Sequence, residues 1–132
     1  MNSIIVAEDE PILSSLIKTE LESSGYTVRV ANNGKEVWDM LQDPEQTMPD
    51  IILSDLLMPE MTGYELLEKL KGDERFKHIP CLVLSNSGQI DDLNRAFKLG
   101  ASDVLIKANF NPDQLTGKVA ALLPKPTAPH ES

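Results

Sequence analysis

The alternation of five short apolar runs with five amphipathic segments is the feature of this sequence that most limits its fold. The apolar runs predict β-strands at residues 3–7, 27–31, 50–54, 81–85 and 104–106. Apolar residues then recur at helical spacing within residues 12–21, 37–41, 66–70, 90–97 and 115–122, which predicts a helix after each strand. Near-continuous apolar strands separated by single helices are typical of a parallel sheet covered by helices on both faces. We therefore expect an α/β fold, a doubly wound sheet of five parallel strands with five helices.

Proline, threonine and glycine mark the ends of several predicted helices. Pro11 suits the first turn of a helix, and Thr62 can cap the N-terminus of another. Gly25 and Gly100 are placed to end the first and fourth helices. A chain of 132 residues is long enough for one domain, which we assign to residues 1–123. The proline-rich residues 124–132 cannot extend a helix and are predicted to form a disordered tail.

The charge balance argues against two classes of partner. The formal net charge is −9, from 21 acidic and 12 basic residues, whereas binding to nucleic acid or to an anionic membrane needs an excess of basic side chains. The sequence has no apolar stretch of membrane-spanning length, and its N-terminus lacks the basic region of a secretion signal. We therefore expect a cytoplasmic protein without nucleic-acid or membrane partners. The single cysteine, Cys81, opens an apolar run and is predicted to be a buried thiol.

Polar side chains stand at the ends of four of the five predicted strands. In chain order they are Glu8, Asp9 and Glu10 after the first strand, Asp55 after the third, Ser85 at the end of the fourth, and Lys107 after the fifth. The carboxyl ends of parallel strands lie along one edge of a sheet, which is where α/β proteins bind ligands. We therefore expect these side chains to converge, although Glu10 is also a natural acid for a helix N-terminus.

The charges in this cluster indicate what it can bind. Two like charges about 4 Å apart repel by roughly 4 kcal/mol at an effective dielectric near 20, so several carboxylates in one site need a cation or a proton. Oxygen ligands in an open site favour Mg²⁺, and Lys107 supplies a second, fixed cation. A phosphoryl group fits between the two cations, and the Ser85 hydroxyl can donate a hydrogen bond to it.

The ordered set of these residues resembles a response-regulator receiver domain. The resemblance rests on the acidic pair, the run Asp55-Leu56-Leu57-Met58-Pro59-Glu60-Met61-Thr62-Gly63, the hydroxyl at the fourth strand and the lysine after the fifth. It covers residues 3 to about 123, nearly the whole chain. It implies a flavodoxin-like sheet with strand order 2-1-3-4-5.

The resemblance also implies a role for each site residue. Asp55 is the expected phosphoacceptor, and Ser85 and Lys107 are expected to contact the phosphoryl group. The expected ligands of Mg²⁺ are Asp9 directly, Glu8 through a water, Asp55, and the backbone carbonyl of Leu57. The expected partner is a sensor histidine kinase or a histidine phosphotransfer protein, whose phosphohistidine supplies the phosphoryl group in a two-component phosphorelay. Phosphorylation would switch a protein-binding surface, and the protein would be a phosphoacceptor rather than an enzyme.

Three residues depart from the family pattern. Val104 stands where an aromatic side chain is common, and a β-branched valine has few rotamers, so we predict that switching depends on the loop of residues 86–90. Ala108 stands where proline is usual, and a cis bond before a non-proline residue costs roughly 2.5 to 4 kcal/mol, which favours trans. Asn86 occupies a position that is usually small, and we predict that it shields the phosphoryl group from water.

Other functions fit the sequence less well. A Mg²⁺-dependent phosphohydrolase with an aspartate nucleophile resembles Asp-x-Asp at that point, but Leu57 stands in place of the second acid. A dinucleotide-binding domain would need a Gly-x-Gly-x-x-Gly turn after the first strand, and the acids found there would repel a pyrophosphate. A docking module that works without phosphorylation stays open, as do a free-standing regulator, a phosphorelay intermediate and a receiver cut from a longer protein.

Overall fold

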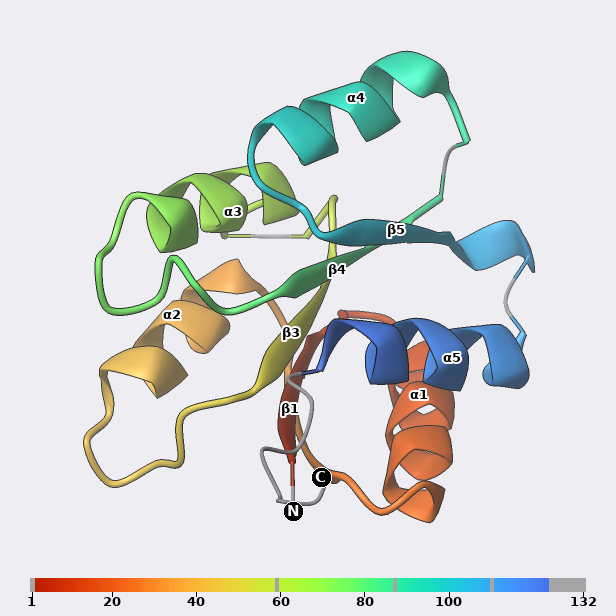
Figure 1. The fold of residues 1–132 in the computed structure, drawn as a ribbon, viewed down its shortest axis with the longest axis horizontal. Coiled ribbons are helices and arrows are strands. Elements are labelled where there is room, and N and C mark those ends of the chain that lie inside the picture. The colour runs from red at the N-terminus through yellow and green to blue at the C-terminus, as the bar shows by residue number, and fades with distance from the viewer. Residues whose placement is uncertain (1, 59, 87, 110, 124–132) are drawn as a thin grey trace, which may run out of the picture.

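The computed structural model describes residues 2–58, 60–86, 88–109 and 111–123, so the predicted disordered tail, residues 124–132, lies outside it. Within these residues five parallel strands form one sheet in the order β2-β1-β3-β4-β5, as expected (Figure 1). The strands are β1 (Ser3–Ala7), β2 (Thr27–Ala31), β3 (Ile51–Asp55), β4 (Cys81–Ser85) and β5 (Asp103–Ile106). This order makes β3 the central strand, with β1 and β4 as its neighbours.

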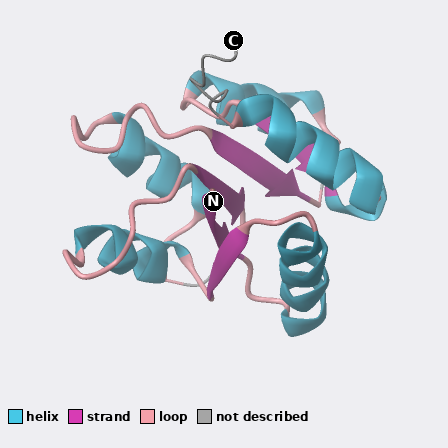
Figure 2. Cartoon of the chain, turned by 60° about the horizontal axis from the view of Figure 1, so that its bottom comes forward, coloured by secondary structure: helices cyan, strands magenta, loops and turns pink. Residues whose placement is uncertain are grey.

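Helices cover both faces of the sheet, which confirms the doubly wound architecture (Figure 2). Those described are α1 (Pro11–Ser23), α2 (Gly34–Gln42), α3 (Gly63–Lys71), α4 (Ile90–Lys98) and α5 (Pro112–Leu122), with a short 3₁₀ helix η1 (Lys107–Asn109) after β5. The apolar side chains of α1 and α5 pack into one core cluster, and those of α2, α3 and α4 pack into another.

Each strand supplies side chains to both core clusters. In β1, Ile5 and Ala7 belong to the cluster under α2, α3 and α4, whereas Ile4 and Val6 belong to the cluster under α1 and α5. Alternation of side chains along a strand explains this division, because successive residues point to opposite faces. Burial on both faces is the reason why the strands are mostly apolar. Cys81 lies in the core as predicted, and burial raises the pKa of its thiol to about 11.

The predicted helix signals are confirmed. Pro11 occupies the first turn of α1, and Thr62 forms a capping box with Glu65 at the start of α3. Gly25 and Gly100 follow α1 and α4 with positive φ angles of 97° and 113°, which glycine adopts without a steric penalty.

Three boundaries differ from the sequence-based expectation. β3 begins at Ile51, one residue later than expected, and Asp55 becomes its last residue. Asp50 precedes the strand and accepts a hydrogen bond from the Ser3 N–H at 2.8 Å through its carboxylate. β5 begins one residue earlier than expected, at Asp103. Lys107 opens the unpredicted helix η1, and the Lys107–Ala108 bond is trans, since the described residues contain no cis peptide.

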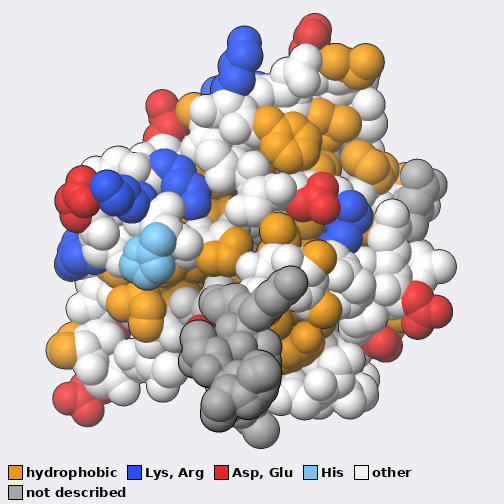
Figure 3. Space-filling view, viewed as in Figure 1, with side chains coloured by type: hydrophobic (Ala, Val, Ile, Leu, Met, Phe, Trp, Pro, Cys, Tyr) orange, Lys and Arg blue, Asp and Glu red, His pale blue; other side chains and the backbone are white. Residues whose placement is uncertain are grey.

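Two helices carry exposed hydrophobic side chains. On α1, Ile12 is 80% exposed and Leu16 is also exposed, and on α4 both Ile90 and Phe97 are exposed. Figure 3 shows hydrophobic side chains gathered over α4 and β5 on the face it presents. No helix in the described ranges has the length and apolar character needed to cross a bilayer.

Candidate functional site

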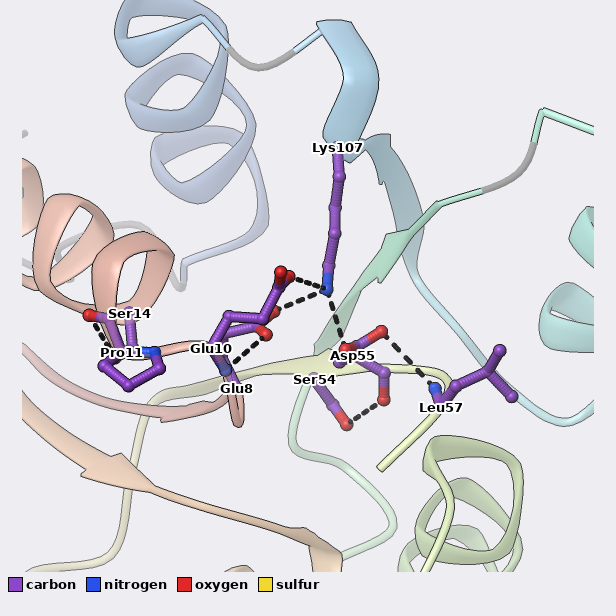
Figure 4. A network of polar contacts seen from close by, with 8 residues as sticks. All are labelled: Glu8, Glu10, Pro11, Ser14, Ser54, Asp55, Leu57 and Lys107. Carbon is purple, nitrogen blue, oxygen red and sulfur yellow. Dashed lines mark hydrogen bonds and ion pairs between the residues drawn. The ribbon is translucent and has the colours of Figure 1, made fainter. Parts of the chain in front are cut away.

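Lys107 joins the ends of three strands in one buried ion-pair cluster (Figure 4). Its Nζ lies 2.7 Å from Glu8 Oε1, just after β1, and 2.7 Å from Asp55 Oδ2, at the end of β3. The side chains of Lys107, Glu8 and Asp55 are 7%, 0% and 4% exposed. The predicted convergence of these three residues is confirmed, and their low exposure makes each charge matter more than it would at the surface.

The Glu8 carboxylate is only partly satisfied by hydrogen bonds. Its Oε2 accepts a hydrogen bond from the Glu10 backbone N–H at 3.0 Å. Its Oε1 is close to Lys107 Nζ, but no group in the described part of the chain meets the geometry of a hydrogen bond to it. The two charges therefore attract each other, while Oε1 accepts no hydrogen bond of good geometry within the described residues.

The cluster shifts two pKa values. Burial raises the pKa of the Glu8 carboxyl, and the contact with Lys107 and the hydrogen bond from the Glu10 backbone only partly oppose this effect. Burial alone would lower the pKa of Lys107, but its hydrogen bond to Asp55 and its close contact with the negative charge of Glu8 outweigh burial and raise it. Lys107 is therefore charged at neutral pH, whereas Glu8 takes up a proton more easily than an exposed glutamate.

The carboxylates of Glu8, Asp9 and Asp55 fit a divalent cation. One oxygen from each lies within 4.8 Å of the others, and Asp9 is exposed to incoming solvent and ions. Hard carboxylate oxygens are the ligands that Mg²⁺ and Mn²⁺ prefer. The buried Oε1 of Glu8, which lacks a hydrogen bond among the described residues, is a donor atom that such an ion or its water can use.

Leu57 and Ser85 lie on the other side of Asp55. The Leu57 backbone N–H donates a hydrogen bond to Asp55 Oδ1 at 3.3 Å, and the Leu57 side chain is 65% exposed. Ser85 is buried at the end of β4 and lines a cavity of about 250 Å³ together with Asp55 and Asn86. Ser85 is therefore within the expected region, while the metal contact of the Leu57 carbonyl stays a prediction.

The three residues that depart from the family pattern lie around this site. Val104 is half-buried against the core under α2, α3 and α4, and Ala108 is exposed in η1. Asn86 is exposed and lines both the cavity beside Asp55 and a groove on the other side. Ser87, in the predicted switch loop, lies outside the described residues. The switching roles of these positions stay predictions.

The groove runs from the site along α1. It has a volume of about 690 Å³, and its lining includes Lys107, Asn86 and Ala108 on one side and Ile12 and Leu16 on the other. The groove therefore joins the polar site to an exposed hydrophobic strip on α1.

Glu10 follows the expected convergence, whereas two lining residues of the cavity were not anticipated. Besides its place before the helix N-terminus, Glu10 puts Oε1 3.4 Å from Lys107 Nζ. Tyr64 and Arg95, from α3 and α4, line the cavity beside Asp55. Nothing local in the sequence connects Tyr64 with Arg95.

Comparisons with known proteins agree with this geometry. The sequence-family model of the response regulator receiver domain matches residues 4–120. Response regulator Rre1 of Synechocystis is 34% identical over 127 residues, which cover 96% of this chain and 53% of that protein. Chemotaxis protein CheY1 of Helicobacter pylori is 31% identical over 121 residues, covering 91% of this chain and 95% of that one.

A solved structure extends the likeness to three dimensions. The Mn²⁺-bound form of response regulator Rcp1 has a TM-score of 0.84 at 25% identity, covering 96% of this chain and 98% of that one. The chain spans about half the length of several of the curated relatives that it matches, including Rre1.

Proposed function

The chain belongs to the response regulator receiver domain family, and from this premise we propose that Asp55 accepts a phosphoryl group from a phosphohistidine. The donor is a sensor histidine kinase or a histidine phosphotransfer protein. The observation that carries the proposal is the position of the Asp55 carboxylate, which ends the central strand between Lys107 and the carboxylates of Glu8 and Asp9.

Phosphoryl transfer to Asp55 forms an acyl phosphate. A carboxylate oxygen of Asp55 bonds to phosphorus while the phosphorus–nitrogen bond of the donor breaks, and the released imidazole keeps the electron pair. Lys107 holds Oδ2 of the carboxylate and the Leu57 N–H holds Oδ1, so the nucleophile is oriented before the donor arrives. Ser85 lines the adjoining cavity, where its hydroxyl can donate to a phosphoryl oxygen.

Glu8, Asp9, Asp55 and the Leu57 carbonyl are the groups that would hold Mg²⁺. When bound, the ion would supply positive charge to phosphoryl oxygens. Lys107 complements it, because its raised pKa keeps a fixed positive charge beside Asp55 at neutral pH. The presence of Mn²⁺ in the Rcp1 structure and the orphan oxygen of Glu8 support a divalent cation here, and Mg²⁺ as its identity is part of the proposal.

A protein donor suits the surface around the site. The hydrophobic strip of Ile12 and Leu16 borders the groove that leads to Lys107. Exposed hydrophobic side chains beside a polar site are typical of a protein-contact surface, and an apolar helix face of the donor can pack there. We propose that this contact takes place in the cytoplasm. The net charge of −9 repels nucleic acids and anionic membranes, so they do not compete with the protein donor for this surface.

Steady hydrolysis of phosphate esters is a weaker candidate. A phosphohydrolase of this kind needs an acid two residues after the nucleophile, and the position holds the apolar, exposed Leu57. A docking module that works without phosphorylation would not need a buried lysine shared between two carboxylates. Replacing such a buried ion pair with well-packed hydrophobic residues often leaves the stability of the fold unchanged or raises it, so stability alone does not account for the pair.

Intact mass spectrometry tests the assignment of Asp55. Wild-type protein, Asp55→Asn and the exposed-acid control Asp39→Asn are incubated with Mg²⁺ and acetyl phosphate, and in parallel with a phosphorylated histidine phosphotransfer protein. We expect one phosphoryl adduct on the wild type and on Asp39→Asn, and none on Asp55→Asn. An equal adduct on Asp55→Asn, or no adduct on the wild type with either donor, contradicts the proposal.

A further inference from the structure

The cavity beside Asp55 reaches a helix that the proposed transfer does not use. It has a volume of about 250 Å³ and is lined by Asp55, Ser85 and Asn86 at the site and by Tyr64, Asp92 and Arg95 from α3 and α4. Lys107 is not among the lining residues. The positive charge in the wall of this cavity is therefore that of Arg95.

Arg95 is held by an aromatic ring rather than by an acid. Its guanidinium carbon lies 3.9 Å from the centroid of the Tyr64 ring, and the Tyr64 side chain is only 8% exposed. Within the described ranges the guanidinium makes no hydrogen bond and has no carboxylate within 4.0 Å. A cation–π contact of this kind is worth about 0.5 to 1 kcal/mol at an exposed site, which is less than a hydrogen bond between charged groups.

The other two arginines of the chain are committed to oxygen acceptors. Arg29 donates to Gln46 Oε1 and to the Thr47 carbonyl, both at 2.6 Å. Arg75 also lies over a ring, with its guanidinium carbon 4.6 Å from the Phe76 centroid, but it is fixed by an ion pair of 2.8 Å with Asp73. Arg95 therefore differs from Arg75 in keeping its donors available.

Phosphorylation of Asp55 adds acceptor oxygens to which such donors can bind. A phosphoryl group replaces the single charge of the carboxylate with about two negative charges and adds three strong acceptor oxygens. Lys107 is already shared between Asp55 and Glu8. The added charge would attract a cation that reaches the same cavity and forms only a weak contact where it lies.

We propose that Arg95 is a phosphoryl-binding residue: once Asp55 is phosphorylated, its guanidinium leaves the Tyr64 ring and donates hydrogen bonds to the phosphoryl group from the cavity. This inference rests on the proposed role of Asp55. Because Arg95 belongs to α4, its movement couples the charge at Asp55 to the contact between α3 and α4. It supplies a route for the signal that does not require an aromatic side chain at Val104.

Asp92 opposes this movement. Its carboxylate lines the same cavity one helical turn before Arg95, and it repels a negatively charged phosphoryl group there. Neutralising Arg95 and neutralising Asp92 should therefore have opposite effects on phosphoryl binding. Removing the charge of Arg95 weakens phosphoryl binding, and removing the charge of Asp92 strengthens it.

The test uses beryllium trifluoride, an anion that mimics a phosphoryl group on a carboxylate, in the presence of Mg²⁺. Its affinity is measured by calorimetry for wild type, Arg95→Gln, Arg95→Lys, Asp92→Asn, Asp55→Asn and the control Arg75→Gln. We expect Arg95→Gln to weaken binding about tenfold or more, which is the effect of losing one charge-assisted hydrogen bond. The affinity of Arg95→Lys should lie between those of wild type and Arg95→Gln. Asp92→Asn should bind the anion more tightly than wild type, and Arg75→Gln should bind it with wild-type affinity.

Nuclear magnetic resonance of the arginine side chains provides a readout that a purely structural role would not move. On addition of the anion the Nε–H signal of Arg95 should shift in wild type but not in Asp55→Asn, while the Arg75 signal stays fixed. If binding depends on Asp55 but Arg95→Gln binds within twofold of wild type and the Arg95 signal is unmoved, the inference is overturned and the role of Asp55 stands. If Asp55→Asn binds like wild type, the proposed function itself fails.

Discussion

Replacing Lys107 with methionine removes the positive charge between Glu8 and Asp55 and retains most of the apolar stem of the side chain. The carboxylate oxygens left behind lie within 4.8 Å of each other, and at an effective dielectric near 20 they repel by about 3.5 kcal/mol. We therefore expect Lys107→Met to lower the free energy of unfolding by about 3 to 4 kcal/mol at pH 8 without divalent cations. Breaking a buried ion pair by removing one partner typically has this effect.

The loss must depend on pH, because a carboxylate escapes repulsion by taking up a proton. Protonation costs about 1.4 kcal/mol for each pH unit above the ordinary glutamate value of 4.5, so the loss at pH 6 is limited to about 2 kcal/mol. The raised pKa of Glu8 makes it the group that protonates. Adding Asp55→Asn to Lys107→Met should restore most of the stability at pH 8, because it removes one of the two buried negative charges, those of Glu8 and Asp55.

Urea denaturation in a chelator, followed by the fluorescence of Trp38, measures these differences. Trp38 packs edge-on against Phe76, with ring centroids 5.6 Å apart, so its emission reports loss of the core. Lys118→Met is the matched control, because Lys118 pairs with Asp103 in a more exposed ion pair and should lose less than about 1 kcal/mol. A loss below 1 kcal/mol for Lys107→Met at pH 8, or an equal loss at pH 6 and pH 8, would refute this account of the site.

Three further predictions concern other parts of the site. Because burial raises the pKa of Glu8, Mg²⁺ affinity should fall between pH 7.5 and pH 5 more steeply than for exposed carboxylates, and Glu8→Gln should flatten the calorimetric profile. A β-carbon at Gly63 would overlap the Asp55 carbonyl oxygen, so Gly63→Ala should lose about 1 to 3 kcal/mol in denaturation, whereas Gly117→Ala, in open space on α5, should gain up to about 1 kcal/mol. Asn86→Ala should shorten the lifetime of the phosphorylated protein in a time course of intact mass, and an unchanged lifetime would count against shielding by Asn86.

The order of elements and most of the site were predictable because both depend on simple patterns. Strands buried on two faces must be apolar, and helices on a sheet must be apolar at helical spacing, so each element left a local signal. The parallel arrangement then required Glu8, Asp55 and Lys107 to meet at one edge. Lys107 pairs with the two acids because opposite charges placed at the same edge of the sheet attract each other.

The features that were missed depend on contacts between distant residues. Just before β3, the Asp50 carboxylate accepts a hydrogen bond from Ser3, which is 47 positions away. The stacking of Arg95 on Tyr64 depends on how α4 packs against α3, and neither helix carries a local sign of its neighbour.

The neutralising lysine of the site comes from the last strand-to-helix connection, whereas Glu8 follows the first strand and Asp55 ends the third. As the chain leaves the ribosome, Glu8 and Asp55 are therefore made long before Lys107. A sheet assembled from β1, β3 and β4 alone would enclose like charges, and repulsion between them opposes its closure. Docking of β5 and η1 removes that repulsion, so the same ion pairs that orient Asp55 also favour folding of the complete domain over its N-terminal fragments.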